Sequence, residues 1–235
     1  MSAAPELRKY TERSNAIHQE YLSDPELLAR YERFVSWQTN YMLPYYEDLR
    51  ASENYAAAVD FVVSDMTGIG VSRRDHDIAR VVPIMSRMLP NKALRTMASA
   101  MHLNASVLEI NLQICRALYK GMPVDAEISE ANYRAACRQA SSLDECLGLV
   151  MLIEEIGHSL DHVIRIPMIG LTLKAMRRPA RLAGFGALQE FLETGYRIFD
   201  ALEDIDQFLD DITRRMTEVF TRIFAEPTAP EHRSH

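Results

Sequence analysis

The fold class is indicated most clearly near the C-terminus, by residues 205–224, which read IDQFLDDITRRMTEVFTRIF. The apolar residues of this stretch recur at steps of three and four, as they do along one face of an α-helix. They are Ile205, Phe208, Leu209, Ile212, Met216, Val219, Phe220, Ile223 and Phe224. An apolar face of this length is stable in water only when other helices cover it. The stretch therefore predicts a packed helical domain.

Helix signals continue toward the N-terminus, where the first punctuation of the chain is Ser23-Asp24-Pro25-Glu26. It combines a capping side chain, a proline at the first helical position and an acid favoured by the helix dipole. We expect a helix from this point through Trp37 and Tyr41. Pro44 should interrupt or kink it, because proline removes a backbone donor.

The middle of the chain shows further helix boundaries. Ser52 can cap a helix that ends at Gly68-Ile-Gly70, and Ser72-Arg-Arg-Asp75 reads as a capping box that opens the next helix. Pro83 should bend that helix. Pro90-Asn91 restarts the chain.

Two breaks are expected before residue 130. His102-Leu-Asn104 predicts the first, and a helix should then run through Leu118 until Gly121-Met-Pro123 ends it. Residues 121–129 form the clearest loop. This loop is also a possible division of the domain into two lobes.

The C-terminal half contains a second capping box, Ser142-Leu-Asp-Glu145, before a helix that should reach about Pro167. A short helix is expected from Pro167 to Arg177-Arg178-Pro179. Strand signals are almost absent, because alternating β-branched and aromatic runs between turns do not occur. The prediction is an all-α, compact, bundle-like single domain over residues 1–225, with about ten helical segments. Residues 226–235 are expected to be a flexible tail.

Composition narrows the class of protein. The formal net charge is −7, whereas a surface that binds nucleic acid normally shows a basic excess. The three cysteines, Cys115, Cys137 and Cys146, have no CxxC spacing, so we expect reduced, partly buried thiols and not a disulfide framework. The first ten residues contain no apolar signal segment, and no apolar window approaches the ~20 residues of a spanning helix. A soluble, cytoplasmic protein with no transmembrane segment is expected.

A series of landmarks is similar to a family of uncharacterised bacterial proteins named for an FFLEELY motif. The similarity covers roughly residues 30 to 225, and the stretch Phe61–Thr67 keeps the first Phe, an acid and the apolar pattern of the motif, but not the double Phe or the Tyr. The resemblance implies a helical fold and brings no activity. The landmarks are Tyr55–Gly68, Arg74-Asp75, Val82-Pro83, Leu89-Pro90, Leu160-Asp161, Pro167–Gly170, Arg178–Gly184 and Leu188–Gly195.

One candidate site is a metal centre on the stretch Glu154-Glu155-Ile-Gly-His158-Ser-Leu-Asp161-His162. Glu154, His158 and His162 fall at i, i+4 and i+8 on one helix face. Glu155 and His158 have the Glu-x-x-His spacing of di-iron carboxylate bundles, and these side chains suit zinc, iron or manganese. The chain has no second Glu-x-x-His, although His18, His76 or His102 could contribute. The competing interpretation is a polar helix face with no metal or other cofactor.

A second candidate is an anion site formed by Lys174, Arg177, Arg178 and Arg181 around Pro179. Pro179 could open a helix whose free amides and neighbouring guanidiniums would hold a phosphate or carboxylate. The alternatives are cations that complement the end of a helix, and ion pairs with the acidic stretch that contains Asp206, Asp210 and Asp211. The acids of that stretch could share a divalent ion, but they more often answer a helix dipole.

An aromatic group is the last candidate, and it suits either a pocket or core packing. Its members are Trp37, Tyr41, Tyr45, Tyr46 and Tyr55.

The sequence leaves three functions open. The favoured hypothesis is a non-catalytic helical protein that binds a protein partner or another copy of itself, since no complete catalytic set is visible and 12 methionines suit adaptable contacts. A metal-dependent enzyme centred on His158 is the alternative, and the third is a binder of a small anionic ligand at Arg177–Arg181. Whether the protein is an enzyme is thus left open, and the lack of a complete catalytic set makes a non-catalytic role the favoured one.

Overall fold

The structure is a computed structural model that describes residues 3–67 and 71–225, with the side chains of residues 64–67, 71–74 and 84–88 outside the description. Within these ranges the chain is helical and contains no strand, which confirms the predicted all-α class. No helix among the described residues has the length and apolarity needed to cross a membrane. The elements are α1 (Ala4–Leu22), α2 (Pro25–Met42), the 3-10 helix η1 (Leu43–Tyr46), α3 (Glu47–Ala51), α4 (Ala56–Thr67), α5 (Val71–Met88), α6 (Asn91–Leu118), α7 (Glu130–Ala140), α8 (Leu143–Ile164), α9 (Pro167–Leu182), α10 (Gly186–Asp200) and α11 (Ile205–Phe224).

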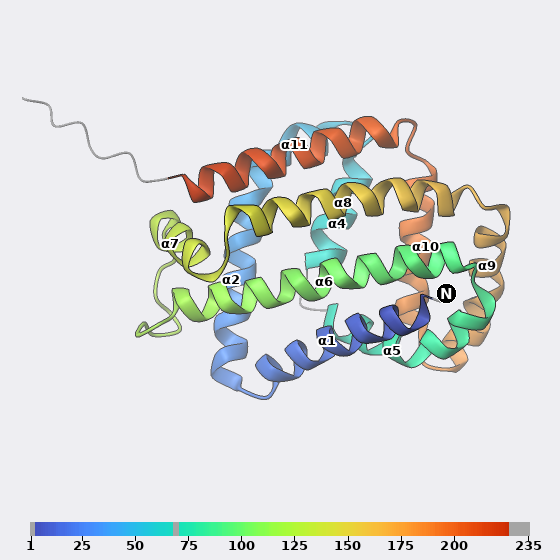
Figure 1. The fold of residues 1–235 in the computed structure, drawn as a ribbon, viewed down its shortest axis with the longest axis horizontal. Helices are drawn as coiled ribbons and strands as arrows, with labels where there is room; N and C mark the ends of the chain where they lie inside the picture. Colours follow the sequence, from blue (N-terminus) through green and yellow to red (C-terminus); the bar gives the residue numbers. More distant parts are fainter. Residues whose placement is uncertain (1–2, 68–70, 226–235) are drawn as a thin grey trace, which may run out of the picture.

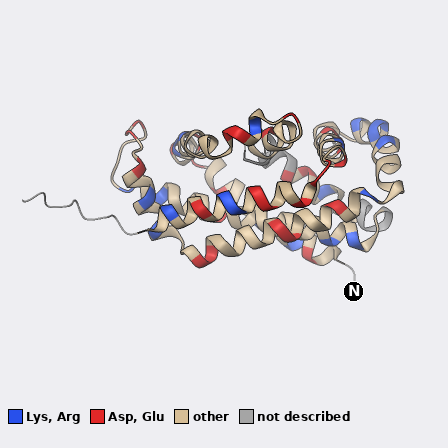
Figure 2. Ribbon diagram, turned by 90° about the horizontal axis from the view of Figure 1, so that it is seen from above, with Lys and Arg blue, Asp and Glu red and all other residues tan. Residues whose placement is uncertain are grey.

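The helices form two layers that cross each other. Helices α1, α6, α8 and α11 lie side by side in the first layer (Figure 1). Helices α2, α4 and α10 run across this layer on its other side, and Figure 2 shows α2 and α10 nearly end-on. Helix α9 lies at one end of the molecule, beside α10. Crossed helices touch closely near their crossing points and diverge away from them, which leaves room between the layers.

Several helix starts have the predicted chemistry. Asp24 caps α2, and its carboxylate accepts hydrogen bonds from the backbone N–H groups of Glu26 and Leu27. Ser142 and Glu145 form the expected reciprocal capping box of α8. Pro44 ends α2 in a short 3-10 turn, and Pro83 lies inside α5 as predicted.

The break predicted at His102-Leu-Asn104 is wrong, because α6 runs without interruption from Asn91 to Leu118. The polar side chains of His102 and Asn104 instead make contacts with other helices. The ring of His102 stacks on Tyr10 at 4.4 Å between centroids, and the amide of Asn104 donates hydrogen bonds to two other helices. Polar residues that usually stop a helix here connect it to its neighbours.

Three further boundaries differ from the prediction. Helix α4 begins at Ala56, and Ser52 instead follows the end of α3. Helix α5 begins at Val71, so Ser72 lies inside it. The Asp75 carboxylate of the supposed capping box accepts from His18 and Asn104, and the Ser72 side chain is outside the described residues. The helix end predicted at Gly68–Gly70 and the tail at 226–235 are also outside them.

The longest loop connects α6 to α7 and coincides with the predicted loop at residues 121–129. Gly121 has a φ of 75°, a left-handed conformation that glycine adopts without steric cost. Ser129 then caps α7 by accepting a hydrogen bond from the N–H of Asn132. The two-lobe division proposed at this loop stays a prediction.

Close contact between α8 and α11 depends on one small residue. Gly157 of α8 is buried, and a Cβ atom at this position would overlap the side chain of Leu209 on α11. A second glycine of α8, Gly148, faces open space. The side chain of Leu209 therefore packs directly on the backbone of α8 at Gly157.

Candidate functional site

A cavity of about 270 Å³ lies between the two helix layers. Its wall takes residues from α1, α2, η1, α4, α6, α7, α8 and α11, so both layers contribute to it. Most of the wall is apolar. Representative wall residues are Val35, Val59, Leu108, Leu149, Ile212 and Met216.

One end of the cavity carries a buried polar cluster. His18 of α1 and Asp75 of α5 lie 2.9 Å apart, from Nε2 to Oδ2, and their side chains are 2% and 0% exposed. The other ring nitrogen of His18, Nδ1, lies 2.6 Å from the hydroxyl of Tyr21. Asn104 of α6 donates from Nδ2 to Asp75 at 2.6 Å and to the hydroxyl of Ser14 at 3.1 Å. His18, Tyr21 and Asn104 line the cavity.

The protonation pattern of this cluster follows from its partners. Burial, and then the charge of Asp75, raises the pKa of Tyr21 to about 12. Tyr21 is therefore a protonated phenol at neutral pH and can donate to Nδ1 of His18. A carboxylate accepts hydrogen bonds, so Nε2 carries the proton directed at Asp75. The result is one chain of hydrogen bonds from Tyr21 through His18 to Asp75.

A second polar group faces the cavity from α2, α6 and α7. The amide of Gln38 donates from Nε2 to Oδ1 of Asn111 at 3.3 Å and to the hydroxyl of Tyr133 at 3.1 Å. Burial holds the pKa of Tyr133 well above its usual value, so this phenol also stays protonated. The cavity thus has two separate positions that can hydrogen-bond to a polar atom of a ligand.

The predicted aromatic group divides between these roles. Tyr46 lines the cavity. Trp37, Tyr41 and Tyr45 pack on the core beside it, with the ring of Trp37 stacked on Tyr41. Tyr55 packs against Phe208. Core packing is therefore the main role of the group, and one member reaches the cavity.

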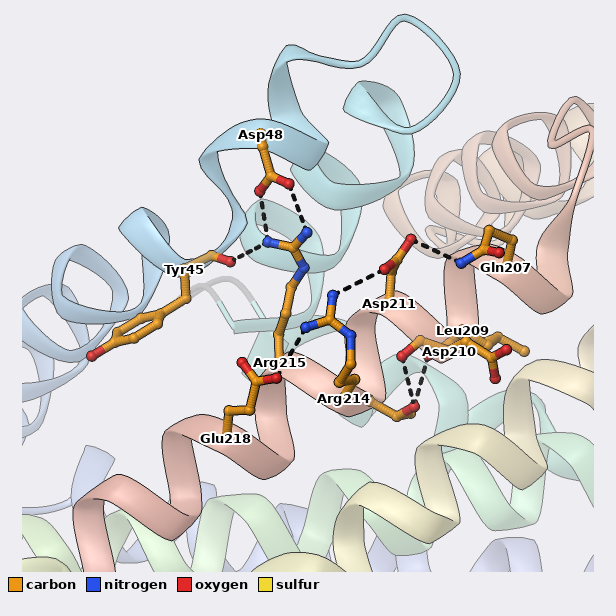
Figure 3. Close-up of polar contacts among 10 residues, drawn as sticks. Tyr45, Asp48, Gln207, Leu209, Asp210, Asp211, Arg214, Arg215 and Glu218 are labelled. Atoms are coloured by element: carbon orange, nitrogen blue, oxygen red, sulfur yellow. Dashed lines mark hydrogen bonds and ion pairs between the residues drawn. The ribbon is translucent and has the colours of Figure 1, made fainter.

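A polar clamp joins two parts of the cavity wall. The guanidinium of Arg215 on α11 donates two hydrogen bonds of 2.6 Å to the carboxylate of Asp48 and one of 2.9 Å to the carbonyl of Tyr45 (Figure 3). Arg215 follows one turn after Ile212 and precedes Met216, which both line the cavity. The clamp consequently holds α11 against η1 and α3. By contrast, the ion-pair partners of Arg214 among the described residues, Asp211 and Glu218, belong to its own helix.

The cysteines are free and buried, as predicted. Cys115 lies on α6, Cys137 on α7 and Cys146 on α8. Burial raises the pKa of Cys115 and of Cys137 to about 12, so these thiols are poor nucleophiles. Cys137 and Cys146 line the cavity and contribute apolar wall there.

The proposed metal residues Glu154, Glu155, His158 and His162 all lie on the exposed part of α8. His158 is 47% exposed, with Nδ1 3.2 Å from Asp206 of α11. Nδ1 of His162 lies 2.8 Å from the carbonyl oxygen of His158, within the same helix.

Other histidines contribute little to this face. His102 lies beside Glu154, Glu155 and His158 at a shallow depression. His18 is buried at the cavity, and His76 is exposed on α5. Within the described ranges, no group of three or more His, Cys, Asp or Glu side chains is positioned to hold a metal ion.

The proposed anion residues lie on α9, and one expectation about them is wrong. Pro179 is inside α9, which continues to Leu182, so it does not open a new helix. The free backbone amides of a helix start are therefore absent at Pro179, because twelve residues of continuous helix precede it. Lys174, Arg178 and Arg181 are exposed.

The fourth cation of this group, Arg177, makes a bidentate ion pair with Glu193 of α10 at 2.6 and 2.8 Å. Its partner is therefore neither Asp206 nor Asp211, which pair with His158 and Arg214. Asp204 caps α11 by accepting from Gln207, which is the dipole role expected for part of the acidic stretch.

Sequence reasoning missed the cavity and most of its polar residues. His18 was considered only as an additional metal ligand, and Asp75 only as part of a cap. The local signal that did exist was the pair His102 and Asn104 inside an otherwise regular helical pattern. A polar residue there indicates either a break or a buried partner, and only the tertiary structure distinguishes these.

Comparison with known proteins gives one match. The model of a family described as Domain of unknown function (DUF8198) matches residues 17–230. The match includes His18, Asp75, Asn104 and Arg215. No curated protein matches the chain, and no solved structure matches it.

Proposed function

Because this chain belongs to the family described as Domain of unknown function (DUF8198), whose description carries no activity, we propose its function from the cavity. The protein binds a small, largely apolar molecule between its two helix layers. The observation that carries this proposal is the 270 Å³ cavity, with His18 and Gln38 among its polar wall residues.

The size of the cavity supports a ligand. Protein interiors are close-packed, with few voids larger than a water molecule. The 270 Å³ cavity is partly open, so water reaches its largely apolar wall. A bound apolar molecule would remove this wall from water, which is favourable.

The wall also indicates the kind of molecule. A cavity of ~150 Å³ holds benzene, so 270 Å³ suits a ligand of roughly ten non-hydrogen atoms. Its body would contact the apolar wall, while a hydroxyl, carbonyl or carboxyl group could bond to the Tyr21 end or to the Gln38 end. We infer a ring or short hydrocarbon chain with one or two polar atoms.

A binding role fits the polar cluster better than a catalytic role. A general base takes its proton from a group within hydrogen-bond reach, which is either the reactant or a side chain that attacks it. Both ring nitrogens of His18 already have protein partners, Asp75 and Tyr21. The group at Nδ1 is the Tyr21 phenol, and because its pKa is raised to about 12 it is a weak nucleophile at neutral pH. The cluster therefore suits the orientation of a ligand, and enzyme activity stays an open question.

Native mass spectrometry of the purified protein tests this proposal, with organic extraction of whatever is released. We expect a bound species that is lost in Leu149→Phe, which fills the cavity. Leu147→Phe is the matched control, because Leu147 lies on the same helix outside the cavity wall. Retention of the same species by Leu149→Phe, or a protein that never carries or takes up a small apolar molecule, contradicts the proposal.

The hypothesis of a protein partner or a second copy remains a second proposal. It is supported by large apolar side chains that are 67–83% exposed, which are Met151, Met168, Leu171 and Leu182. Light scattering across a concentration series tests self-association. A mass that stays monomeric at every concentration contradicts it.

The remaining expectations have less support. A metal centre on α8 would need ligands beyond His158 and its neighbours, and an anion site on α9 has exposed cations without an enclosing pocket. A cytoplasmic location is supported by the three free thiols. Bacterial origin and kinship to the FFLEELY-motif proteins rest on the sequence resemblance alone.

A further inference from the structure

Helix α9 carries an apolar stripe that faces away from the protein. Its inner side is buried through Ile169 and Ala180. On its outer side Met168 is 70% exposed, Leu171 67% and Leu182 83%. These residues and the exposed Ala175 are spaced by three, four and seven, so they form one line along the helix. The line is about 21 Å long at 1.5 Å per residue.

A basic stripe runs beside this apolar line. Lys174, Arg178 and Arg181 are exposed and spaced by four and three residues, so they also share one line along the helix. Arg177 lies farther round the helix, in its ion pair with Glu193. Figure 2 shows a group of Lys and Arg residues at the end of the molecule where Figure 1 places α9, and other Lys and Arg residues elsewhere.

The charge of α9 is opposite to that of the whole chain. The sequence of the helix, PMIGLTLKAMRRPARL, contains four cations and no Asp or Glu, whereas the chain has a net charge of −7. A surface that attracts this helix must therefore be anionic, and it must also accept apolar side chains.

We propose that α9 docks this protein on an anionic lipid surface. The helix lies in the plane of the membrane, with Met168, Leu171 and Leu182 inserted at the boundary between headgroups and acyl chains. Lys174, Arg178 and Arg181 face the lipid phosphates. An apolar stripe flanked by cations is the pattern of interfacial helices, and both parts contribute to their binding.

A second copy of the chain is a poorer occupant of this face. In a symmetric dimer the same surface patch contacts itself. The cations of one α9 would then face those of the other, with no acid on either helix. Like charges in such a contact disfavour it, whereas an anionic membrane neutralises them.

Flotation with lipid vesicles tests the proposal on the intact protein. We expect binding to vesicles of phosphatidylcholine and phosphatidylglycerol in equal amounts, weaker binding at high salt, and no binding to phosphatidylcholine alone. Lys174→Ser with Arg178→Ser should weaken binding at least about tenfold, since each basic residue contributes measurably near an anionic surface. Leu171→Ser with Leu182→Ser should also weaken it.

Matched variants make the result specific to α9. Lys9→Ser with Lys120→Ser removes the same charge from exposed positions elsewhere, and Leu22→Ser with Met151→Ser removes exposed apolar side chains elsewhere. Both should bind as the unchanged protein does. Absence of binding to the anionic vesicles, or equal loss in the α9 and control variants, overturns the proposal.

Light scattering separates the remaining outcome. A dimer that is lost in Leu171→Ser with Leu182→Ser, together with no vesicle binding, would assign the face to a second copy and also overturn the proposal. Vesicle binding does not require an occupied cavity. Its failure therefore leaves the proposed cavity ligand unaffected.

Discussion

His18 and Asp75 form a direct hydrogen bond of 2.9 Å although they are 57 positions apart in the chain, and both side chains are almost fully buried. The imidazole and the Asn104 amide are the partners of this carboxylate that face the cavity side. Removing His18 takes away one of the hydrogen bonds that this buried carboxylate accepts, and lost hydrogen bonds to buried charged groups are among the larger costs of a single substitution.

We therefore expect His18→Ala to lower the free energy of unfolding by about 3 kcal/mol or more. Urea denaturation measures the loss. His76→Ala is the control, because His76 is an exposed histidine on α5. It should change the free energy of unfolding by less than about 0.5 kcal/mol. Equal effects of the two substitutions would show that the buried pair has no special role.

The Arg215 clamp predicts a difference between two adjacent arginines. Arg215 is 16% exposed and joins α11 to Asp48 and Tyr45, whereas Arg214 is 54% exposed and pairs within its own helix. Pairs within one exposed helix contribute only ~0.3–0.5 kcal/mol. Arg215→Ala should destabilise by about 1–3 kcal/mol, and Arg214→Ala should have a much smaller effect because its ion pairs are exposed.

The same denaturation experiment compares these two variants. Arg215→Ala should also weaken the binding of any ligand retained in the cavity, because the contacts of Arg215 hold together two parts of the cavity wall. A loss of stability in Arg214→Ala as large as that in Arg215→Ala contradicts the assignment.

Two glycines of α8 provide a matched test of helix packing. A methyl group at Gly157 would overlap Leu209, whereas Gly148 has nothing within 4 Å. Gly157→Ala should destabilise by about 1–3 kcal/mol through overpacking. Gly148→Ala should stabilise by up to about 1 kcal/mol, since alanine favours a helix. Thermal unfolding of the two variants measures both signs, and the same sign in both would be inconsistent with the close contact.

The burial of the three thiols predicts that they react slowly with thiol reagents in the folded protein. Burial raises the pKa of Cys115 and of Cys137 to about 12, so little thiolate forms at pH 8. All three cysteines should react with Ellman's reagent in denaturant, and the folded protein should react far more slowly. Rapid labelling of the native protein would mean that the helices around these residues open readily.

Acid should weaken the contact between α9 and α10. Arg177 holds the pKa of the Glu193 carboxyl below its usual value. A group with a lowered folded pKa contributes stability above its unfolded pKa, and the contribution disappears as pH falls through the folded value. Stability should therefore decrease between about pH 5 and pH 3, and Glu193→Gln should lose less over this range. Identical acid dependence with and without Glu193 would contradict this.

Much of the fold follows from local patterns in the sequence. The helix caps at Asp24 and Ser142 and the apolar spacing of residues 205–224 predict helices that the structure contains. These signals act within a few residues of one another, so no knowledge of the tertiary fold is needed. Helix α1 has no side-chain cap, and its start is marked only by Pro5 and Glu6 in the first turn.

The candidate site was not predictable in the same way. Asn104 and Pro179 were interpreted as breaks because each usually disturbs a helix. In the structure both lie inside helices, and Asn104 is satisfied by Ser14 and Asp75. The cavity itself depends on how two layers cross, which is set by contacts between residues far apart in the chain.

The position of α11 in the chain has a consequence for biosynthesis. Helix α11 supplies wall residues on the first layer and is held by Arg215 to Asp48, 167 positions earlier. During synthesis, every other helix that lines the cavity leaves the ribosome before α11 does. The apolar faces of helices α1 to α8 therefore stay uncovered during this time, and the cavity wall is complete only when residues 205–224 emerge. Nascent chains stalled before this stretch are accordingly expected to be clients of chaperones, and the released chain of 235 residues is not.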